Sequence, residues 1–263
     1  MKIYICTLKR SEERLAPLVD QISSMGINYE LVYGIDGRSE EIVNYSDALN
    51  QDYFLGKYKR KLKSTEVACT LSHRKMLQRF VDSQELAAIF LEDDAFFVED
   101  PSGVFNALVG LQYDMVVLGY PSRTRFESTY SKLMEPIYSK VLCSDAYKVG
   151  RSPQKKNFGL MAYYLSRDAA LSLLNADKVW SVADDYDLIS SQVSVLHIRP
   201  YLCFERRNVL SSINSTYRND QSLHLFRRAA SRLLRGFLAY VFLEMATRLG
   251  FEPGYKIKTR GMQ

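Results

Sequence analysis

The chain has 263 residues, enough to bury a sizeable core, and its composition of 47% hydrophobic and 25% charged residues excludes a disordered protein. The net charge of +5 is too small to indicate nucleic acid as a partner, and four widely separated cysteines without a C-x-x-C pair indicate neither a zinc site nor a disulfide framework. The longest apolar stretch, residues 237–245, is far shorter than a membrane-spanning helix, and no signal peptide is visible, so we expect a protein that is cytoplasmic or peripheral to a membrane.

The first forty residues predict a strand, a helix and a second strand. Residues 2–8 form a buried strand pattern, residues 11–26 have helical spacing that ends at a glycine, and residues 29–33 precede a sharp turn. In such a unit the strand ends and the helix start lie along one edge, where ligands bind. We expect five polar residues to cluster there: Thr7, Lys9, Arg10, Arg14 and Asp36.

This cluster has two interpretations. In a nucleotide pocket, Asp36 would accept a hydrogen bond from a base or ribose, and the basic residues would lie near phosphates. Alternatively, Lys9 and Arg10 are solvated turn residues and Asp36 only forms the turn. The sequence has no G-x-G-x-x-G, so a dinucleotide site of the Rossmann type is not predicted.

Residues 40–63 are polar and rich in tyrosine, and they end in five basic residues within 57–63. We interpret this run as a solvated loop or a lid near an anionic ligand rather than a nucleic-acid patch.

Residues 64–82 predict a long helix, on which His73 lies on the apolar face. His73 is therefore either a hydrogen-bonded core residue or, together with Glu66, a group that meets a substrate. The residues that share this face are Glu66, Cys69 or Thr70, His73, Leu77, and Phe80 or Val81.

Three consecutive acids, Glu92, Asp93 and Asp94, follow a strand expected over residues 86–91. Adjacent carboxylates repel one another and resist burial, so they indicate a cationic partner. Side-chain alternation predicts that Glu92 and Asp94 face one cation while Asp93 points the other way. Hard carboxylate oxygens suit Mg²⁺ or Mn²⁺, which keep positions open for phosphate. The alternative is an acidic turn at the strand end.

The second half predicts further strands and helices around a second acidic cluster. Asp184 and Asp185 open a short helix, where either residue is a helix cap or a catalytic base. His197 is a structural residue or an extra metal ligand. The expected elements are a helix over 103–111, strands over 113–119 and 193–198, and a strand and helix within 157–174, with a substrate-binding insertion over 123–156.

Beyond residue 205 the composition changes. Arginines alternate with leucines and phenylalanines in a pattern that predicts one or two basic amphipathic helices over 206–263. Two interpretations stay open. Residues 222–263 bind an anionic membrane surface, or the helices pack on the core with their arginines in water.

Four segments, in this order, together resemble glycosyltransferase family 25, the lipopolysaccharide-type glycosyltransferases. They span residues 1 to about 205, so residues 206–263 lie outside the resemblance. The segments are residues 3–14 (IYICTLKRSEER), 66–73 (EVACTLSH), 89–94 (IFLEDD) and 183–186 (ADDY).

The resemblance implies an α/β, GT-A-like fold over residues 1–205, with a mixed, mostly parallel sheet flanked by helices. The amphipathic pattern adds a C-terminal helical extension over 206–263. The resemblance also implies inverting transfer of a hexose, typically galactose from UDP-galactose, onto a lipopolysaccharide or lipooligosaccharide glycan, usually with Mn²⁺ or else Mg²⁺.

Carried over by position, Glu92 and Asp94 would hold the metal, and Asp185, with Asp184 second, would be the base. The chain departs from the family pattern at residues 157–160, where a glycine-threonine turn is expected, which leaves the donor sugar open. The donor-binding residues would be Thr7, Lys9, Arg10, Arg14, Asp36, His73, Glu92 and Asp93.

Two other classes fit parts of the sequence. A protein of the same fold without activity would be a carbohydrate-binding or scaffold protein with a vestigial acidic tripeptide. A metal-dependent phosphoesterase or a hydrolase fits acids alone, but the chain has only three histidines for a two-metal site.

Overall fold

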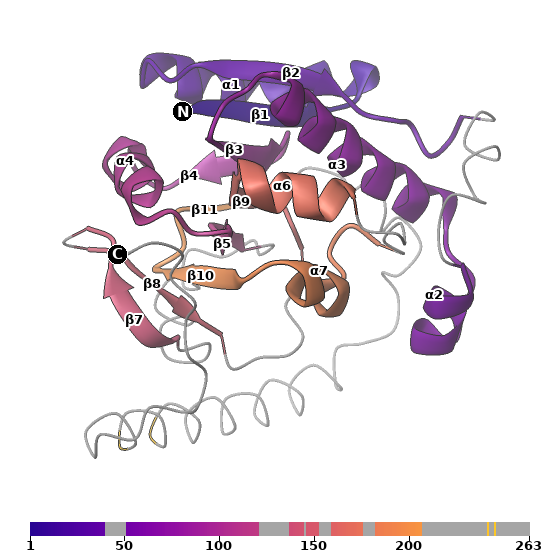
Figure 1. The fold of residues 1–263 in the computed structure, drawn as a ribbon. Coiled ribbons are helices and arrows are strands. Elements are labelled where there is room, and N and C mark those ends of the chain that lie inside the picture. The colour runs from indigo at the N-terminus through magenta and orange to yellow at the C-terminus, as the bar shows by residue number, and fades with distance from the viewer. Residues whose placement is uncertain are drawn as a thin grey trace, which may run out of the picture.

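A mixed sheet of eight strands forms the centre of the computed structural model (Figure 1). The strand order is β2-β1-β3-β9-β5-β10-β8-β7, and β9 and β8 run opposite to the other six. The strands are β1 (Lys2–Thr7), β2 (Tyr29–Tyr33), β3 (Ala87–Glu92), β5 (Met115–Val117), β7 (Tyr138–Leu142), β8 (Lys148–Arg151), β9 (Ala162–Ser166) and β10 (Val195–Arg199). The structure describes residues 1–39, 51–120, 137–144, 146–152, 159–175 and 182–206, with residues 241 and 245.

The central strands are apolar on both faces because helices cover both sides of the sheet. In β3, Ile89 and Leu91 enter one core, whereas Ala88 and Phe90 enter the other. Leu18 of α1 and Leu108 of α4 complete the first core. The second core contains residues of three helices, including Met76, Phe80, Ala170, Leu173 and Ile189.

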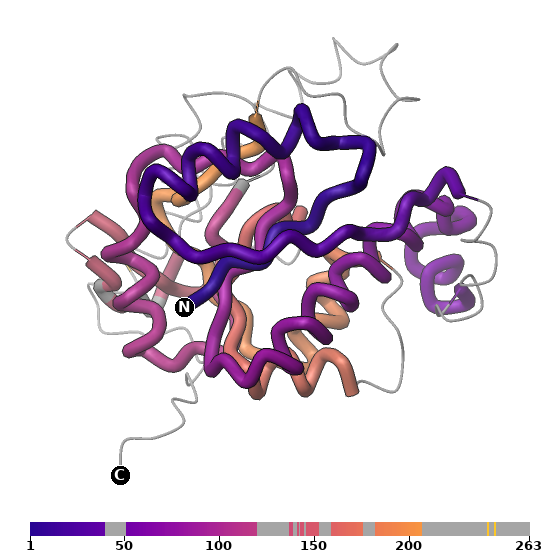
Figure 2. The backbone as a smooth tube through the Cα atoms, turned by 90° about the horizontal axis from the view of Figure 1, so that it is seen from above, coloured from indigo at the N-terminus to yellow at the C-terminus, as the bar shows by residue number. Residues whose placement is uncertain are grey.

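Helices α1 and α3 lie on opposite sides of the sheet, and α2 lies beyond the N-terminal end of α3 (Figures 1 and 2). This layering brings the start of α1, the N-terminal half of α3 and the ends of β1 and β3 to one edge. The helices are α1 (Glu12–Ser24), α2 (Gln51–Tyr58), α3 (Ser64–Asp82), α4 (Ser102–Leu111), α6 (Arg167–Leu174) and α7 (Tyr186–Gln192), with a 3-10 turn, η1 (Lys9–Ser11), before α1.

A second sheet has three strands, and the first of them in the chain, β4 (Ala95–Phe97), directly follows the acidic tripeptide. The order of this sheet is β4, β11 (Cys203–Glu205), β6 (Gly119–Tyr120). Because β4 begins one residue after Asp94, the chain must turn between β3 and β4, and this turn contains Asp93 and Asp94.

The expected fold class, a mixed and mostly parallel sheet flanked by helices, is confirmed. Gly26, where we expected the first helix to stop, adopts φ +67° just after its C-cap, as a helix-ending glycine does. Some elements were not predicted. Helix α2 lies within residues expected to form a loop, and the strands β7 and β8 lie within the expected insertion. The C-terminal extension lies outside the described residues, apart from Arg206, Val241 and Met245.

Candidate functional site

A pocket of about 610 Å³, part of it open to solvent, lies at the edge where β1 and β3 end and the turn after β2 begins. The N-terminal half of α3 forms its other wall. Seven of the eight residues expected to bind the donor line this pocket, whereas Lys9 is exposed and is not part of the lining. The seven are Thr7, Arg10, Arg14, Asp36, His73, Glu92 and Asp93.

Arg10 and Asp36 form an ion pair at the pocket, with 2.6 Å between Arg10 Nε and Asp36 Oδ2. Asp36 also accepts a hydrogen bond from the backbone N–H of Arg38. The hydrogen bond from Arg10 and that backbone N–H lower the pKa of Asp36. Asp36 thus both shapes its turn and neutralises Arg10.

Arg14, on α1, contacts both aspartates of the acidic tripeptide. It forms an ion pair with Asp93 and lies 3.6 Å from Asp94 Oδ2, and Thr7 donates a hydrogen bond of 2.9 Å to Asp93. Burial raises the pKa of both aspartates, that of Asp94 to about 7, against the opposing effect of Arg14. The cationic partner that adjacent carboxylates require is therefore supplied, for these two, by the protein itself.

The expected side-chain alternation along the acidic tripeptide is wrong. Strand β3 ends at Glu92, and Asp93 and Asp94 form the turn that leads into β4. Both aspartates consequently reach Arg14, while Glu92 faces His73 on α3. Alternation applies only within an extended strand, and the strand ends at Glu92, two residues before Asp94.

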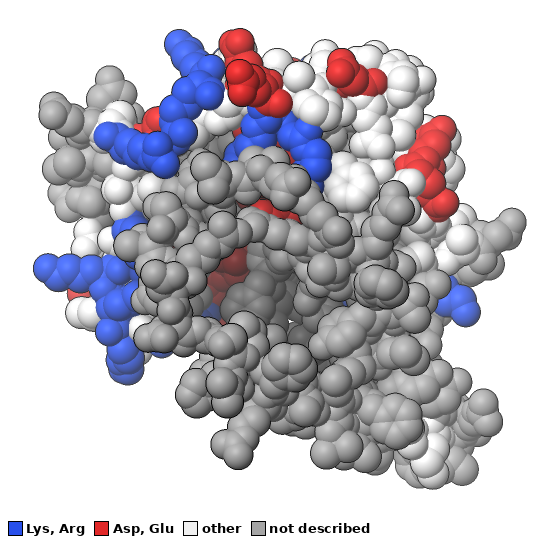
Figure 3. All heavy atoms as spheres, turned by 180° about the vertical axis from the view of Figure 1, so that it is seen from behind, with Lys and Arg blue, Asp and Glu red and all other residues white. Residues whose placement is uncertain are grey.

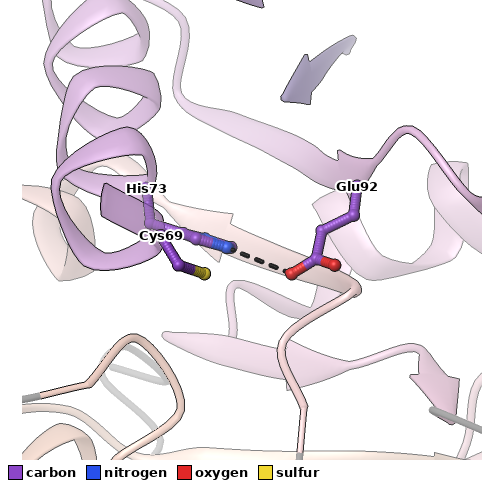
Figure 4. A group of neighbouring side chains, drawn as sticks. All are labelled: Cys69, His73 and Glu92. Carbon is purple, nitrogen blue, oxygen red and sulfur yellow. Dashed lines mark ion pairs between the residues drawn. The ribbon is translucent and has the colours of Figure 1, made fainter. Parts of the chain in front are cut away.

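Glu92 faces the pocket together with two side chains of α3. His73 Nε2 lies 3.5 Å from Glu92 Oε1, and Cys69 projects from the preceding turn of the helix toward the same point (Figure 4). Burial acts to raise the pKa of Glu92, but the nearby His73 and Arg14 outweigh it and lower the pKa. On the other side of its ring, His73 Nδ1 lies 3.1 Å from the hydroxyl of Tyr163.

The two residues expected to share a hard ion, Glu92 and Asp94, are not brought together as one ligand group. Asp94 is absent from the pocket lining and contacts Arg14, although its Oδ1 is buried without a hydrogen-bond partner. Within the described residues, the one group of three suitable ligands is Cys69, His73 and Glu92. A metal ion in this pocket would therefore meet sulfur and nitrogen as well as oxygen, which is not the all-oxygen donor set that Mn²⁺ prefers.

Asp185 is a helix cap. Its carboxylate accepts a hydrogen bond from the backbone N–H of Leu188 at the start of α7, and Lys57 on α2 donates to it over 2.6 Å. Lys57 also pairs with Asp187. Since Asp185 is only 1% exposed and holds α2 against α7, the capping role that the sequence left open is confirmed.

Asp184 is half-buried, and its hydrogen-bond partner differs from those of Asp185. Its Oδ2 accepts a hydrogen bond of 2.9 Å from the backbone N–H of Gly159. Burial raises the pKa of Asp184, with a smaller contribution from the negative charge of Glu92 and an opposing one from His73. The influence of these two charges indicates that Asp184 lies on the Glu92 and His73 side of the site.

Three contributors to the site were missed in the sequence. Cys6 lines the pocket at the end of β1, Cys69 lies beside His73, and Lys57 binds the second acidic cluster. The spacing of Cys69 and His73, four apart on one helix, was a usable signal. His197, in contrast, is a core residue: it is buried in β10 against Tyr186, and burial lowers its pKa to about 3.

One face of the molecule carries both signs of charge. On the face drawn in Figure 3, basic and acidic side chains of the described residues are interspersed. No helix within the described part of the chain is long and apolar enough to cross a membrane.

Comparison with known proteins gives one family and several distant structures. No curated protein matches the chain. Similar solved structures are S. aureus TarS 1-349 in complex with UDP-GlcNAc (11% identity, TM-score 0.45, 82% of this chain and 61% of that chain) and A197 from STIV (12%, 0.42, 78% and 84%). Another is the inositol-1-phosphate CTP transferase from T. maritima (16%, 0.39, 80% and 91%). The model of glycosyltransferase family 25, described as an LPS biosynthesis protein, matches residues 1–188, so the chain belongs to this family and is a glycosyltransferase.

Proposed function

We propose that this glycosyltransferase transfers a hexose, most simply galactose from UDP-galactose, with inversion, onto a lipopolysaccharide or lipooligosaccharide glycan. The observation that carries the proposal is the pocket, which collects seven of the eight residues expected to bind the donor at one sheet edge in a family 25 chain. Acidic and basic side chains that are distant in the sequence lie together in this pocket, and the basic ones are suited to bind the phosphates of a nucleotide diphosphate.

The charged side chains of the pocket suit a sugar donor whose diphosphate replaces Asp36 as the partner of Arg10. Arg10 is paired with Asp36 at the pocket, and 41% of its side chain is exposed. A diphosphate can therefore compete for Arg10, while Asp36 accepts a hydrogen bond from the base or ribose. Arg14 keeps Asp93 and Asp94 neutralised close to an anionic ligand.

We propose Asp184 as the general base. The acceptor hydroxyl oxygen attacks C1 of the sugar, the bond from C1 to the diphosphate oxygen breaks, UDP leaves with the bonding electrons, and Asp184 takes the hydroxyl proton. Asp185, the first choice from the sequence, is less suited because its carboxylate caps α7 and binds Lys57. A divalent cation, when bound at such sites, neutralises charge on the departing diphosphate.

Variants of the two aspartates distinguish their roles. Asp184→Asn should lower kcat roughly 100- to 10,000-fold with little change in thermal stability, since it removes the base but keeps a hydrogen-bond acceptor. Asp185→Asn should lower the melting temperature, because it removes a charged cap and the partner of Lys57. If both variants lose the same factor in kcat and the same amount of thermal stability, this assignment is contradicted.

A donor panel tests the proposal as a whole. The full chain is incubated with UDP-galactose, UDP-glucose and UDP-GlcNAc, with added Mn²⁺ or with a chelator, and both binding and release of UDP are measured. We expect one UDP-hexose to bind and to hydrolyse slowly without acceptor. Absence of binding and hydrolysis for every donor would refute the proposal. Binding of a donor without hydrolysis or transfer would favour the inactive, carbohydrate-binding alternative.

We also propose that the enzyme works in the cytoplasm at the inner membrane surface of a bacterium. Support comes from the family description, which names lipopolysaccharide biosynthesis, and from the basic amphipathic pattern of residues 222–263. Lipid-linked acceptors are held at a membrane, so a peripheral enzyme would meet them there.

A further inference from the structure

We propose that Cys69, His73 and Glu92 form a binding site for a zinc-class divalent ion, Zn²⁺ or Co²⁺, on the wall of the pocket. One ligand atom from each residue lies within 4.8 Å of the other two. All three residues also line the pocket, so an ion from solvent can reach them.

Regular secondary structure holds the three ligands. Cys69 and His73 are four residues apart on α3, so they project from one face of the helix, and Glu92 is the last residue of β3 (Figure 4). Because α3 packs against β1, which pairs with β3, the two ligand-bearing elements have a fixed separation. A site on a helix and a strand needs little rearrangement to bind an ion.

The distance between His73 and Glu92 is closer to that between two ligands of one metal ion than to that of a hydrogen bond. His73 Nε2 and Glu92 Oε1 lie 3.5 Å apart, which is long for a charge-assisted hydrogen bond. Two ligand atoms at about 2.1 Å from a tetrahedral ion are about 3.4 Å apart. For a sulfur at about 2.3 Å from the ion, the corresponding separation between ligand atoms is about 3.6 Å. Cys69 Sγ lies within 4.8 Å of the other two ligand atoms, so binding an ion would bring it closer by about 1 Å at most.

Tyr163 orients the histidine. Its hydroxyl lies 3.1 Å from His73 Nδ1 and the two rings stack, so a neutral His73 can keep its proton on Nδ1 and present Nε2 to an ion. Tyr163 is only 3% exposed, which fixes the ring. Metal-binding histidines are typically held in this way through their other nitrogen.

The chemical types of the three ligands determine which class of ion binds. Thiolate, imidazole and carboxylate together suit borderline ions such as Zn²⁺, whereas Mn²⁺ prefers oxygen ligands and binds such sites more weakly. Three protein ligands leave a position open toward the pocket, as in zinc sites that bind a further ligand.

Cobalt titration of the full chain under reducing conditions tests this site. We expect one equivalent of Co²⁺ to give tetrahedral d–d bands and a sulfur-to-cobalt charge-transfer band, with Zn²⁺ but not Mn²⁺ displacing it at equal concentration. Cys69→Ser should abolish the charge-transfer band, and Tyr163→Phe should weaken binding by about 10- to 100-fold. Cys143→Ser is the matched control: this cysteine is buried beside Val104 outside the pocket, and its loss should leave the band intact.

A folded wild-type chain without the charge-transfer band would overturn the proposal, as would a Cys69→Ser variant with an unchanged spectrum. If Cys69→Ser does not fold by circular dichroism, Glu92→Gln decides: it should keep the sulfur band with weaker affinity, and unchanged affinity would refute the site. The titration contains no nucleotide sugar, so its outcome is independent of the proposed transfer.

Discussion

At the residue scale, the three acids at the end of β3 have separate environments. Asp93 is 1% exposed and Asp94 7%, and both contact Arg14, whereas Glu92 is partly exposed to the pocket beside His73. A buried carboxylate is tolerated when a cation neutralises it, and a single guanidinium serves two of them here. Arg14 is therefore a structural requirement of the site as well as a candidate donor ligand.

Replacement of Arg14 tests this requirement. Arg14→Ala should destabilise the protein by about 3 kcal/mol at pH 7.5, because it leaves buried carboxylates without a partner. Urea unfolding measures the change. Arg10→Ala is the control, since its ion pair with Asp36 is partly exposed to solvent and should contribute less than about 1 kcal/mol. Equal losses in both variants would contradict the role given to Arg14.

At the element scale, α3 organises the site through its first turns. Its N-terminus packs against the turn after β2, its second and third turns carry Cys69 and His73, and its C-terminal half packs Met76 and Phe80 on the sheet. One helix thus links the core to the pocket. Changes at its N-terminus should affect both stability and ligand binding.

The charged cap of α3 gives a pH-dependent prediction. Glu66 accepts a hydrogen bond of 2.9 Å from the backbone N–H of Lys63 and pairs with Arg60. Burial opposes these contacts, but they lower the pKa of Glu66. Their stabilisation is therefore present above the unfolded pKa of about 4.3 and lost as pH falls through the folded value. Glu66→Gln should cost about 1 kcal/mol at pH 7 and much less at pH 3 by denaturant unfolding; a constant difference would contradict it.

The turn after β2 leaves no room for a side chain at Gly37. A Cβ there would lie 2.5 Å from Thr65 Cα in the first turn of α3, so backbone must move. Gly37→Ala should destabilise the protein by about 1–3 kcal/mol and weaken UDP-sugar binding, as measured by unfolding and calorimetry. Gly110→Ala on α4 meets no atom within 4 Å and should instead stabilise by about 0.5–1 kcal/mol without affecting binding. Similar behaviour of the two variants would be unexpected.

At the scale of the whole molecule, the site lies at one edge of a layered domain, and a basic segment follows that domain in the sequence. Parallel strands β2, β1 and β3 end at the same edge, so their following turns meet. The residues after 205 carry arginines among leucines and phenylalanines. A membrane contact through that segment would keep the catalytic domain near a lipid-linked acceptor.

Charge removal in the basic segment tests the membrane contact. Replacing Arg227, Arg228, Arg232 and Arg235 by glutamine in the full chain should abolish cosedimentation with anionic vesicles, since each basic residue near the surface contributes about 1 kcal/mol. Hydrolysis of the donor should be retained. Vesicle binding of the wild type should weaken as salt rises. Unchanged vesicle binding in the variant would favour helices packed on the core.

The sequence by itself determined the family, the order of the main strands and helices, and most of the pocket. Periodicity defines elements locally, and strands that run parallel bring their ends together, so Thr7, Arg10 and Asp36 were expected at one edge. Tertiary structure decided the partners. The turn after β3 brought Asp93 to Arg14, the docking of α2 brought Lys57 to the helix cap Asp185, and the packing of α3 brought Cys69 to Glu92. Such contacts join residues far apart in the chain, so they depend on packing rather than on local pattern.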